Sequence, residues 1–558
     1  MTVVHAGAPR AADQSISAAA TVPESLVGPA SLTPDATMPT GAADTLPPND
    51  NLDSAAPGQA ATAPLKPTRE GKWNFSARAS AELTLTNNVA LAPPGQEEAD
   101  LVLGLSLPLG VRRAGPRARF LAEYTPTVYL YARNKDSDYL QNNLRSFLSL
   151  EAVDDFFFID ATANSSPIYV SPFLPRPESG SSITQNRTQQ TALGLSPYIR
   201  NRTSTGWTYQ LRNDNFWNGY SDPALAGGLA SRIFAAIESP PTRVNYEFDY
   251  TYVYTRNGDP PIAYYEQVVR FRPALRATRT VTVSARLGYE SNDYATSQYS
   301  GPVYGAGIDW TPNPRTRVDG FLEHRFFGAA YGLNLSERTR RTVWRLRGMR
   351  GPSTIVEKPL SQRPAMIADL LDDASRARIS DPIQGQGEQA IKQFLNSAGP
   401  PLSLTRPYGF YADQVYLSNQ WTGSVALLGR RNTVELSLFW QQNEPITTRG
   451  ITSAAAAGLA QFSPQFSQQG FTLSFSHRLS EFTSLTLTAN RIYSQLTGPN
   501  ATLAPSQDKS IQDTVRLGLT HRLGAKTDGS IALRRSNFDS VIHPYQELAV
   551  LAALAHSF

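Results

Sequence analysis

Charged side chains recur at odd-numbered positions in one stretch near the middle of the chain: Arg317, Asp319, Glu323 and Arg325. The even-numbered positions between them are apolar or small, as at Val318, Gly320 and Leu322. Side chains alternate between the two faces of a strand, so this stretch predicts a strand with one charged face and one apolar face. Opposite charges on one face form ion pairs or line a path for a charged solute.

Two more pairs share the same spacing pattern: Arg78 with Glu82, and Arg286 with Glu290. The positive charge of the chain is mostly arginine, and guanidinium groups stay charged and pair well with carboxylates. We therefore favour an ion-pair network that fills and stiffens a lumen. The alternative is a charged pathway that steers a polymer or a small solute. Tyr129 and Tyr131 are expected on an inner face, where rings of this kind stack on sugars.

Three histidines recur near the end of the chain in similar contexts. FTLSFSHRL and VRLGLTHRL both close with His-Arg-Leu, and the chain ends in ALAHSF. This repeat places His477, His521 and His556 at the same rim, on an outward face. A metal or catalytic role is one interpretation. The favoured interpretation is a belt of histidines at a membrane interface, because the histidine side chain has an apolar body and a polar tip.

The sequence lacks the motifs of the common catalytic and cofactor-binding sites. It has no phosphate-binding glycine loop, no serine nucleophile elbow and no cysteine, which excludes disulfides and thiolate metal sites. We expect no enzyme activity, no cofactor, no metal and no nucleic-acid partner. The net charge of +4 is mild.

Strict alternation of apolar and polar residues is the feature that organises the rest of the chain. Between Trp73 and Leu85 every odd position is apolar, and every even position is polar or charged. Helices return apolar residues every three or four positions, so this pattern indicates strands. No apolar run of about 20 residues is present, which excludes a membrane protein built from helices. The alternation predicts a transmembrane antiparallel β-barrel, which needs only every second residue apolar.

The connections between the expected strands are of two kinds. Short polar turns occur near 153–155, 201–203, 239–241 and 274–278, and longer links fall at 169–184, 218–226 and 291–300. Short turns at one rim and long loops at the other are typical of outer-membrane barrels. Counting strands gives about 22, within a range of 18 to 24. An even number returns both ends of the barrel to the periplasmic rim.

Two segments depart from this rhythm. Residues 1–72 form an Ala/Pro-rich leader that we expect to be disordered, and residues 3–8 are consistent with the end of a secretion signal that starts upstream. Residues 73–558 form the barrel. Within it, residues 351–411 are predicted as a helical loop insertion, because Met366 to Ile379 has the spacing of an amphipathic helix. Pro108 marks an irregular position in its strand.

The last strand alternates to the final residue, Phe558. A terminal strand of this kind resembles the signal by which barrel proteins reach the assembly machinery of the outer membrane. We therefore expect outer-membrane lipid and the barrel-assembly machinery as partners, and the outer membrane as the location. His556 departs from the usual signal, which has an aromatic residue two positions before the end.

A longer motif resembles a known family. The run W-x-P-x-P-R-T, then H-R-F-F-G-x-x-Y, then L-S-E-R-T-R-R-T-V-W, between Trp310 and Trp344, closely resembles the outer-membrane proteins associated with the PEP-CTERM/exosortase system. Asn87-Asn88-Val89 and the segment 156–160 fit the same family. The resemblance covers residues 73–558 and implies a barrel linked to exopolysaccharide production and export. A pore or export component is expected, with polysaccharide as its partner. The alternative is a scaffolding barrel that docks partner proteins.

Overall fold

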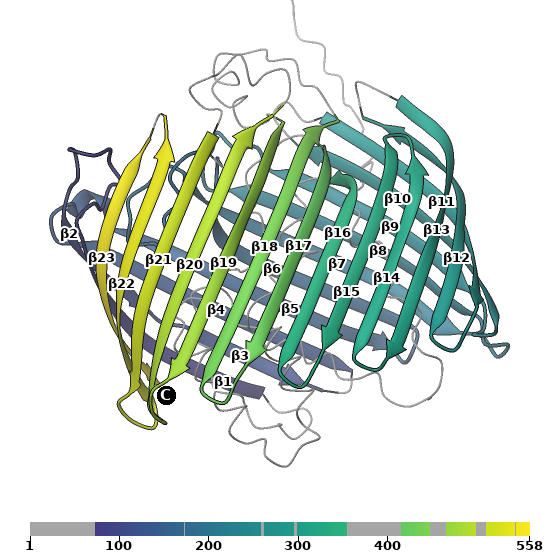
Figure 1. Cartoon of the computed structure of the whole chain (residues 1–558). Coiled ribbons are helices and arrows are strands. Elements are labelled where there is room, and N and C mark those ends of the chain that lie inside the picture. Colours follow the sequence, from purple (N-terminus) through teal and green to yellow (C-terminus); the bar gives the residue numbers. More distant parts are fainter. Residues whose placement is uncertain are drawn as a thin grey trace, which may run out of the picture.

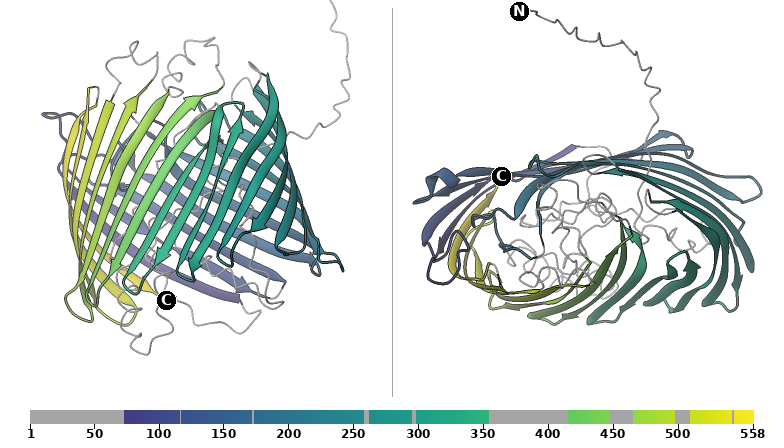
Figure 2. Two further views of the ribbon diagram at one scale, coloured as in Figure 1. Left: turned by 45° about the vertical axis from the view of Figure 1, so that its right-hand side comes forward. Right: turned by 90° about the horizontal axis from the view of Figure 1, so that it is seen from above.

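We analysed a computed structural model of the full chain. It describes residues 73–353, 415–446, 465–497 and 509–558, apart from residues 116, 172, 258–261, 295–297 and 542. Antiparallel strands follow one another around a single wall (Figure 1). Seen from above, this wall closes into a flattened ring (Figure 2).

The strands alternate in direction between two rims. Those that run from the rim with short turns to the rim with long loops are β1 (Trp73–Thr86), β4 (Ala118–Tyr131), β6 (Phe157–Tyr169), β8 (Thr208–Tyr220), β10 (Val244–Asn257), β12 (Val281–Asp293), β14 (Thr316–Arg325), β16 (Thr342–Ser353), β18 (Asn432–Pro445), β20 (Thr483–Leu496) and β22 (Thr527–Ser540). Those that return are β2 (Asp100–Ser106), β3 (Leu109–Ala114), β5 (Tyr139–Val153), β7 (Arg187–Arg202), β9 (Gly228–Glu238), β11 (Ile262–Arg276), β13 (Gln298–Asn313), β15 (Gly328–Arg338), β17 (Tyr416–Leu428), β19 (Phe466–Arg478), β21 (Lys509–Arg522) and β23 (Tyr545–Ser557).

β2 and β3 are two halves of one strand. Both pair with β1 on one side and with β4 on the other, and the same register continues across the interruption at residues 107–108. Proline has no N–H to give to a ladder, so Pro108 ends the regular pairing there. The described residues therefore build a wall of 22 strands. β1 pairs with β23 between residues 78 and 86, which closes the barrel. The prediction of about 22 strands is confirmed.

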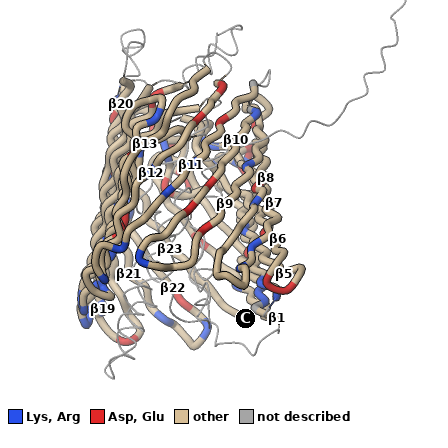
Figure 3. The backbone as a smooth tube through the Cα atoms, turned by 90° about the vertical axis from the view of Figure 1, so that its right-hand side faces the viewer, with Lys and Arg blue, Asp and Glu red and all other residues tan. Residues whose placement is uncertain are grey.

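The two rims differ as predicted. Two-residue hairpins such as Arg340-Arg341 and Arg430-Arg431 lie at the short-turn rim, where Thr339 N donates to Thr342 O at 2.8 Å and Gly429 N to Asn432 O at 2.7 Å. Basic residues gather along this rim, at the lower end in Figure 3. The described part of the chain both starts and ends at the same rim, since β1 starts where β23 ends.

The two faces of the wall have opposite polarity. Along β14, Leu322 is 58% exposed and Glu323 only 2%. The same alternation holds on β12, where Leu287 and Tyr289 are exposed while Arg286 and Glu290 are buried. Apolar side chains thus cover the outside and polar ones face inward. A wall of this kind is stable with lipid outside, because each backbone group has its partner in the neighbouring strand.

Helical structure is minor in the part of the chain that the structure describes. It consists of the 3₁₀ turn η2 (Lys135–Ser137), and no helix there is long and apolar enough to cross a membrane. Strand β16 continues to Ser353, so the first three residues of the predicted insertion 351–411 belong to the wall instead. The rest of that insertion and the leader 1–72 lie outside the described residues.

Candidate functional site

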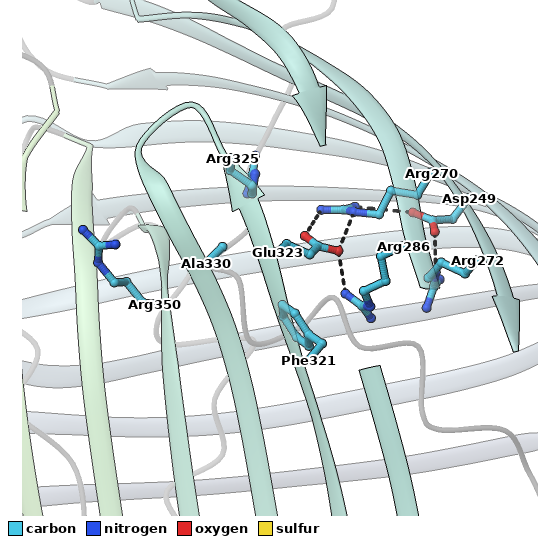
Figure 4. A pocket seen from close by; sticks show the side chains of 9 residues that line it. All are labelled: Asp249, Arg270, Arg272, Arg286, Phe321, Glu323, Arg325, Ala330 and Arg350. Atoms are coloured by element: carbon cyan, nitrogen blue, oxygen red, sulfur yellow. Dashed lines mark hydrogen bonds and ion pairs between the residues drawn. The ribbon is translucent and has the colours of Figure 1, made fainter. Parts of the chain in front are cut away.

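A network of arginines and acids crosses the inner face of β10, β11, β12 and β14 (Figure 4). Glu323 accepts from Arg286 Nη1 at 2.7 Å and lies 3.2 Å from Arg270 Nε. Asp249 lies 2.7 Å from Arg272 Nε and 3.4 Å from Arg270 Nη1. Charge-assisted bonds of this kind are strong when water is excluded, and both carboxylates are almost fully buried.

Small residues on β13 make room for this network. Gly305 pairs with Arg286 on one side and with Glu323 on the other. Because Gly305 has no side chain, the guanidinium group of Arg286 reaches over β13 to the carboxylate two strands away. A Cβ atom on Gly305 would lie 2.1 Å from Leu322 O, so only glycine fits here. Arg286 also lies over the ring of Phe321, 4.0 Å from its centroid.

A second buried pair lies closer to the long-loop rim. Arg325 donates to Glu290 Oε2 from Nε at 2.9 Å and from Nη2 at 2.7 Å. Phe326 N donates to the other carboxylate oxygen at 2.7 Å. Both carboxylate oxygens of Glu290 are thus bound, which ties the end of β14 to β12 across β13. Two N–H groups of Arg325 thus share one carboxylate oxygen, a contact that the several donors of a guanidinium group allow.

The network encloses a narrow cavity that is richer in cations than in anions. Five arginines and two acids line it, together with Phe321 and Ala330: Arg270, Arg272, Arg286, Arg325 and Arg350, and Asp249 and Glu323. Arg350 donates to Ala329 O at 2.7 Å and lies over the ring of Phe327. The arrangement stiffens the wall and presents guanidinium groups that carboxylates or phosphates can contact.

A segment between β6 and β7 folds into the barrel at the long-loop rim. We call residues 173–186 the inward segment. Phe173 packs against Phe466 of β19 and Leu496 of β20, on wall strands far from β6 in sequence. Further on, Gln512 Nε2 of β21 donates to Arg176 O at 2.5 Å.

The second half of the inward segment is held by an ion-pair cluster. Arg534 of β22 donates to Ser179 Oγ at 3.0 Å and to Glu547 Oε1 at 2.8 Å. Glu178 lies 3.9 Å from Arg534 and 3.8 Å from Arg516. Arg534 is 1% exposed, so its charge depends on these partners. The segment is therefore docked on the inner face of β19 to β22.

Aromatic rings support the segment from the other side. Tyr139 donates its hydroxyl to Gly180 O at 2.5 Å and stacks on Tyr129 with ring centroids 5.1 Å apart. Gly180 lies so close to Tyr129 that an added Cβ would meet its ring at 2.4 Å. Tyr131 is buried at 3% exposure. The two tyrosines predicted as candidates for sugar stacking therefore lie beneath the segment.

The charged residues that were predicted to share inner faces do so, but Arg78 and Arg286 pair with acids on other strands and not with the acids of their own strands. Arg78 faces Asp528 of β22 at 3.7 Å, and Glu82 accepts from Thr84 at 3.5 Å. Arg286 pairs with Glu323 of β14 and not with Glu290 of its own strand. Residues four apart on a strand are about 13 Å from each other, whereas strands two apart are separated by about 10 Å.

Arg317 and Asp319 form a looser group near the short-turn rim. Arg317 lies 3.4 Å from Asp309 and 3.6 Å from Asp319, and its side chain is 42% exposed. Exposed pairs of this kind contribute little to stability. They are separate from the buried network of Glu323.

The three histidines lie at the short-turn rim in equivalent positions. Each Nδ1 atom shares a hydrogen bond with the first residues of the preceding strand: His477 with Asn432 at 2.5 Å, His521 with Thr483 at 2.8 Å and His556 with Thr527 at 2.9 Å. Among the described residues, no group of three His, Asp or Glu side chains is placed to hold a metal ion. Phe558 is exposed at the same rim, and its N–H donates to Ala77 O at 3.0 Å.

Two parts of this site were not predicted from the sequence. Arg270, Arg272 and Asp249 alternate on β11 and β10 in the same way as the predicted residues, so the alternation itself was a usable signal. The inward segment carried no such signal. It is a long link like the others, and its contacts are with strands more than 280 residues away.

A closed wall of 22 antiparallel strands, apolar outside and charged inside, defines the class. The protein is a β-barrel of the outer membrane. No family model matches the chain, and no curated protein is similar to it in sequence.

Several solved barrels are similar to the chain. The siderophore receptor PirA from Pseudomonas aeruginosa is 9% identical, with a TM-score of 0.39, over 88% of this chain and 81% of that one. A mutant of the ferric enterobactin receptor PfeA from the same organism, in complex with enterobactin, is 9% identical, with a TM-score of 0.42, over 88% and 82%. The iron transporter FrpB from Neisseria meningitidis is 7% identical, with a TM-score of 0.44, over 87% and 81%.

Proposed function

We propose that this barrel is a pore for an acidic exopolysaccharide in an exosortase-type export system. The run from Trp310 to Trp344 supports the exopolysaccharide part, because it resembles the outer-membrane proteins associated with that system. This run forms the end of β13, all of β14 and β15, and the start of β16. It thus includes Glu323 and Arg325 of the buried network.

The observation that carries the proposal is the cluster of arginines in the cavity beside β14. Five arginines and two acids line the cavity beside β14. A polymer that carries carboxylates gains attraction from such a wall, and the low dielectric of the protein strengthens it. Each arginine already has a partner on the wall. The carboxylates of the polymer therefore compete with these partners for the arginines, so the polymer can leave again. Conduction requires this balance of entry and release.

The inward segment supplies the means of closing the pore. It is docked by Phe173 and by the Arg534 cluster, across from the strands that carry it. Opening requires that these contacts break together. We propose that the segment holds the barrel closed until cargo or a partner displaces it.

The central experiment is deletion of the gene. Loss of surface polysaccharide with its precursor trapped in the periplasm is expected. Normal polysaccharide would contradict the export function.

Planar-bilayer recordings test the pore itself. The wild type is expected to be mostly closed, and replacement of residues 173–186 by a short Gly/Ser linker is expected to raise conductance and to favour anions. The chain has no cysteine, so Phe173→Cys with Phe466→Cys allows a clean cross-link by a short bismaleimide. Cross-linking should keep the channel closed. Equal conductance of wild type, linker variant and cross-linked protein would rule out this segment as the closing element.

The role of the arginines in anion selectivity is tested with Arg350, which lies at the edge of the network. Arg350→Gln is expected to lower the anion selectivity of the opened linker variant. Arg535→Gln, an exposed arginine on the outward face of β22, is the matched control and should leave selectivity unchanged.

The dense ion pairing of the inner wall favours a second candidate function. A wall stiffened in this way suits a scaffold that docks partner proteins at its rims. Normal surface polysaccharide with mislocalised partner proteins in the deletion strain would support the scaffold in place of the pore.

A further inference from the structure

An apolar groove lies on the outer face of the wall, where the barrel closes. It has a volume of about 440 Å³. Its lining is mostly apolar and comes from β1, the β2–β3 strand, β4 and β23: Ala79, Ser80, Ala81, Leu105, Ser106, Leu107, Pro126, Val128, Leu554 and His556. The groove is part of the surface that faces the bilayer, and neither cargo nor the inward segment reaches it from the lumen.

The shape of the groove follows from small residues and two prolines. Ala79 and Ala81 form its floor, while larger outward side chains such as Leu105 and Leu107 stand at its sides. Pro108 interrupts the β2–β3 strand, and Pro126 lies beside it on β4. Since proline lacks an N–H, the wall has fewer ladder bonds here; those that remain include Leu107 N to Pro126 O at 3.1 Å. A shallow, stable hollow results.

A cationic and aromatic group lies between the groove and the short-turn rim. The guanidinium of Arg113 lies over the Trp73 ring, 5.3 Å from its centroid, and Phe120 meets the same ring edge-on at 5.7 Å. Arg113 Nε is buried and has no hydrogen-bond partner among the described residues. Tryptophan and arginine in this position are typical of the level of lipid headgroups.

The spacing of these two features matches one leaflet of a membrane. From Trp73 to Ala79 the strand rises about 20 Å at roughly 3.3 Å per residue. With the tilt of about 40° usual for barrel strands, this corresponds to a depth of about 15 Å. Half of a hydrocarbon core of about 30 Å is the same length.

We propose that the groove binds one anionic phospholipid of the leaflet at the short-turn rim. One acyl chain lies over Ala79 and Ala81, between Leu105, Leu107 and Leu554. The phosphate is bound by the guanidinium group of Arg113, which lies over the Trp73 ring. The occupant is a lipid because the apolar lining continues into the bilayer-facing surface and ends at a cation at headgroup depth. This site is independent of the proposed export function.

Native mass spectrometry of the full chain tests this proposal, using delipidated protein to which phosphatidylglycerol or phosphatidylcholine is added back. The wild type should retain one phosphatidylglycerol per barrel and bind it about fivefold better than phosphatidylcholine, the preference expected of one arginine at a membrane surface. Ala81→Phe fills the groove and should lower retention of both lipids by about tenfold, since a bulky ring replaces the chain. Arg113→Gln should keep lipid bound but abolish the preference.

Matched variants exclude a general effect of the substitutions. Ala285→Phe makes the same change on the exposed outward face of β12, and Arg535→Gln removes an outward arginine from β22; both should behave as wild type. Heat stability in detergent confirms that each variant is folded. Retention by Ala81→Phe equal to that of wild type would overturn the proposal. The proposal would also be overturned if the wild type showed the mass of a dimer and Ala81→Phe did not, because a second copy of the chain would then occupy the groove.

Discussion

Arg286 of β12 donates to Glu323 of β14 at 2.7 Å, across the intervening strand β13. The contact exists because Gly305 lies directly between the two residues and has no side chain. Glu323 also lies 3.2 Å from Arg270 of β11, so one carboxylate joins three strands. The inner wall is therefore held together by interactions beyond those of neighbouring strands.

Replacement of Gly305 should destabilise the barrel. In Gly305→Ala, the new Cβ would lie 2.1 Å from Leu322 O and 2.8 Å from Glu323 Cα, both backbone atoms that cannot rotate away. We expect a loss of about 2–3 kcal/mol in the free energy of unfolding, the range of buried strain. Urea titration followed by tryptophan fluorescence measures it. Gly301→Ala on the same strand is the control, since nothing lies within 4 Å of its Cβ. Equal stability of both variants would contradict the role given to Gly305.

Removal of the charge of Glu323 should have a larger effect than removal of that of Asp319. Glu323→Gln leaves Arg270 and Arg286 buried without a full negative partner, and such losses amount to about 3–5 kcal/mol. Asp319→Asn affects a pair whose arginine is 42% exposed, so about 1 kcal/mol or less is expected. The two variants are compared by the temperature at which each folded barrel loses its compact migration in a gel. A milder effect in Glu323→Gln than in Asp319→Asn would show that the network is not structural.

Two adjacent arginines on β22 should differ in their effect on the channel. Arg534 is 1% exposed and binds Ser179, Glu547 and Glu178, whereas Arg535 points outward and is exposed. Arg534→Met should release the inward segment and increase the open fraction in planar bilayers. Arg535→Met should leave the recordings unchanged. If Arg534→Met stays closed while folded, then the Arg534 cluster does not hold the segment.

Zinc should not stabilise the rim that carries the histidines. His477, His521 and His556 lie on β19, β21 and β23, each separated from the next by one strand, or about 10 Å. His477 and His556 are four strands apart, about 19 Å, which is too far for both imidazoles to reach one ion when zinc lies about 2 Å from each ligand atom. The melting temperature should therefore be the same with Zn²⁺ and with EDTA. A rise in the presence of Zn²⁺ that is lost in His521→Ala would revive the metal interpretation.

The alternation of residue types was sufficient to predict the wall. A strand shows one face to lipid and one to the lumen, so the period of two in segments such as Trp73–Leu85 reveals both the strand and its orientation. Turn residues and link lengths then indicated the strand number and the placement of the rims. These properties are local, because each depends on neighbours in sequence. The same rule explains why the side chains of four charged residues point into the lumen: Arg286, Glu290, Glu323 and Arg325.

Which side chains pair with each other, and where residues 173–186 dock, depended on the closed barrel. Pairing of Arg286 with Glu323, and not with Glu290, requires the register of three strands and the missing side chain at Gly305. Docking of residues 173–186 on β19 to β22 requires ring closure, which brings strands from the two ends of the chain together. Contacts between residues hundreds of positions apart leave no periodic trace in a sequence. They arise from packing in space, which only the folded wall provides.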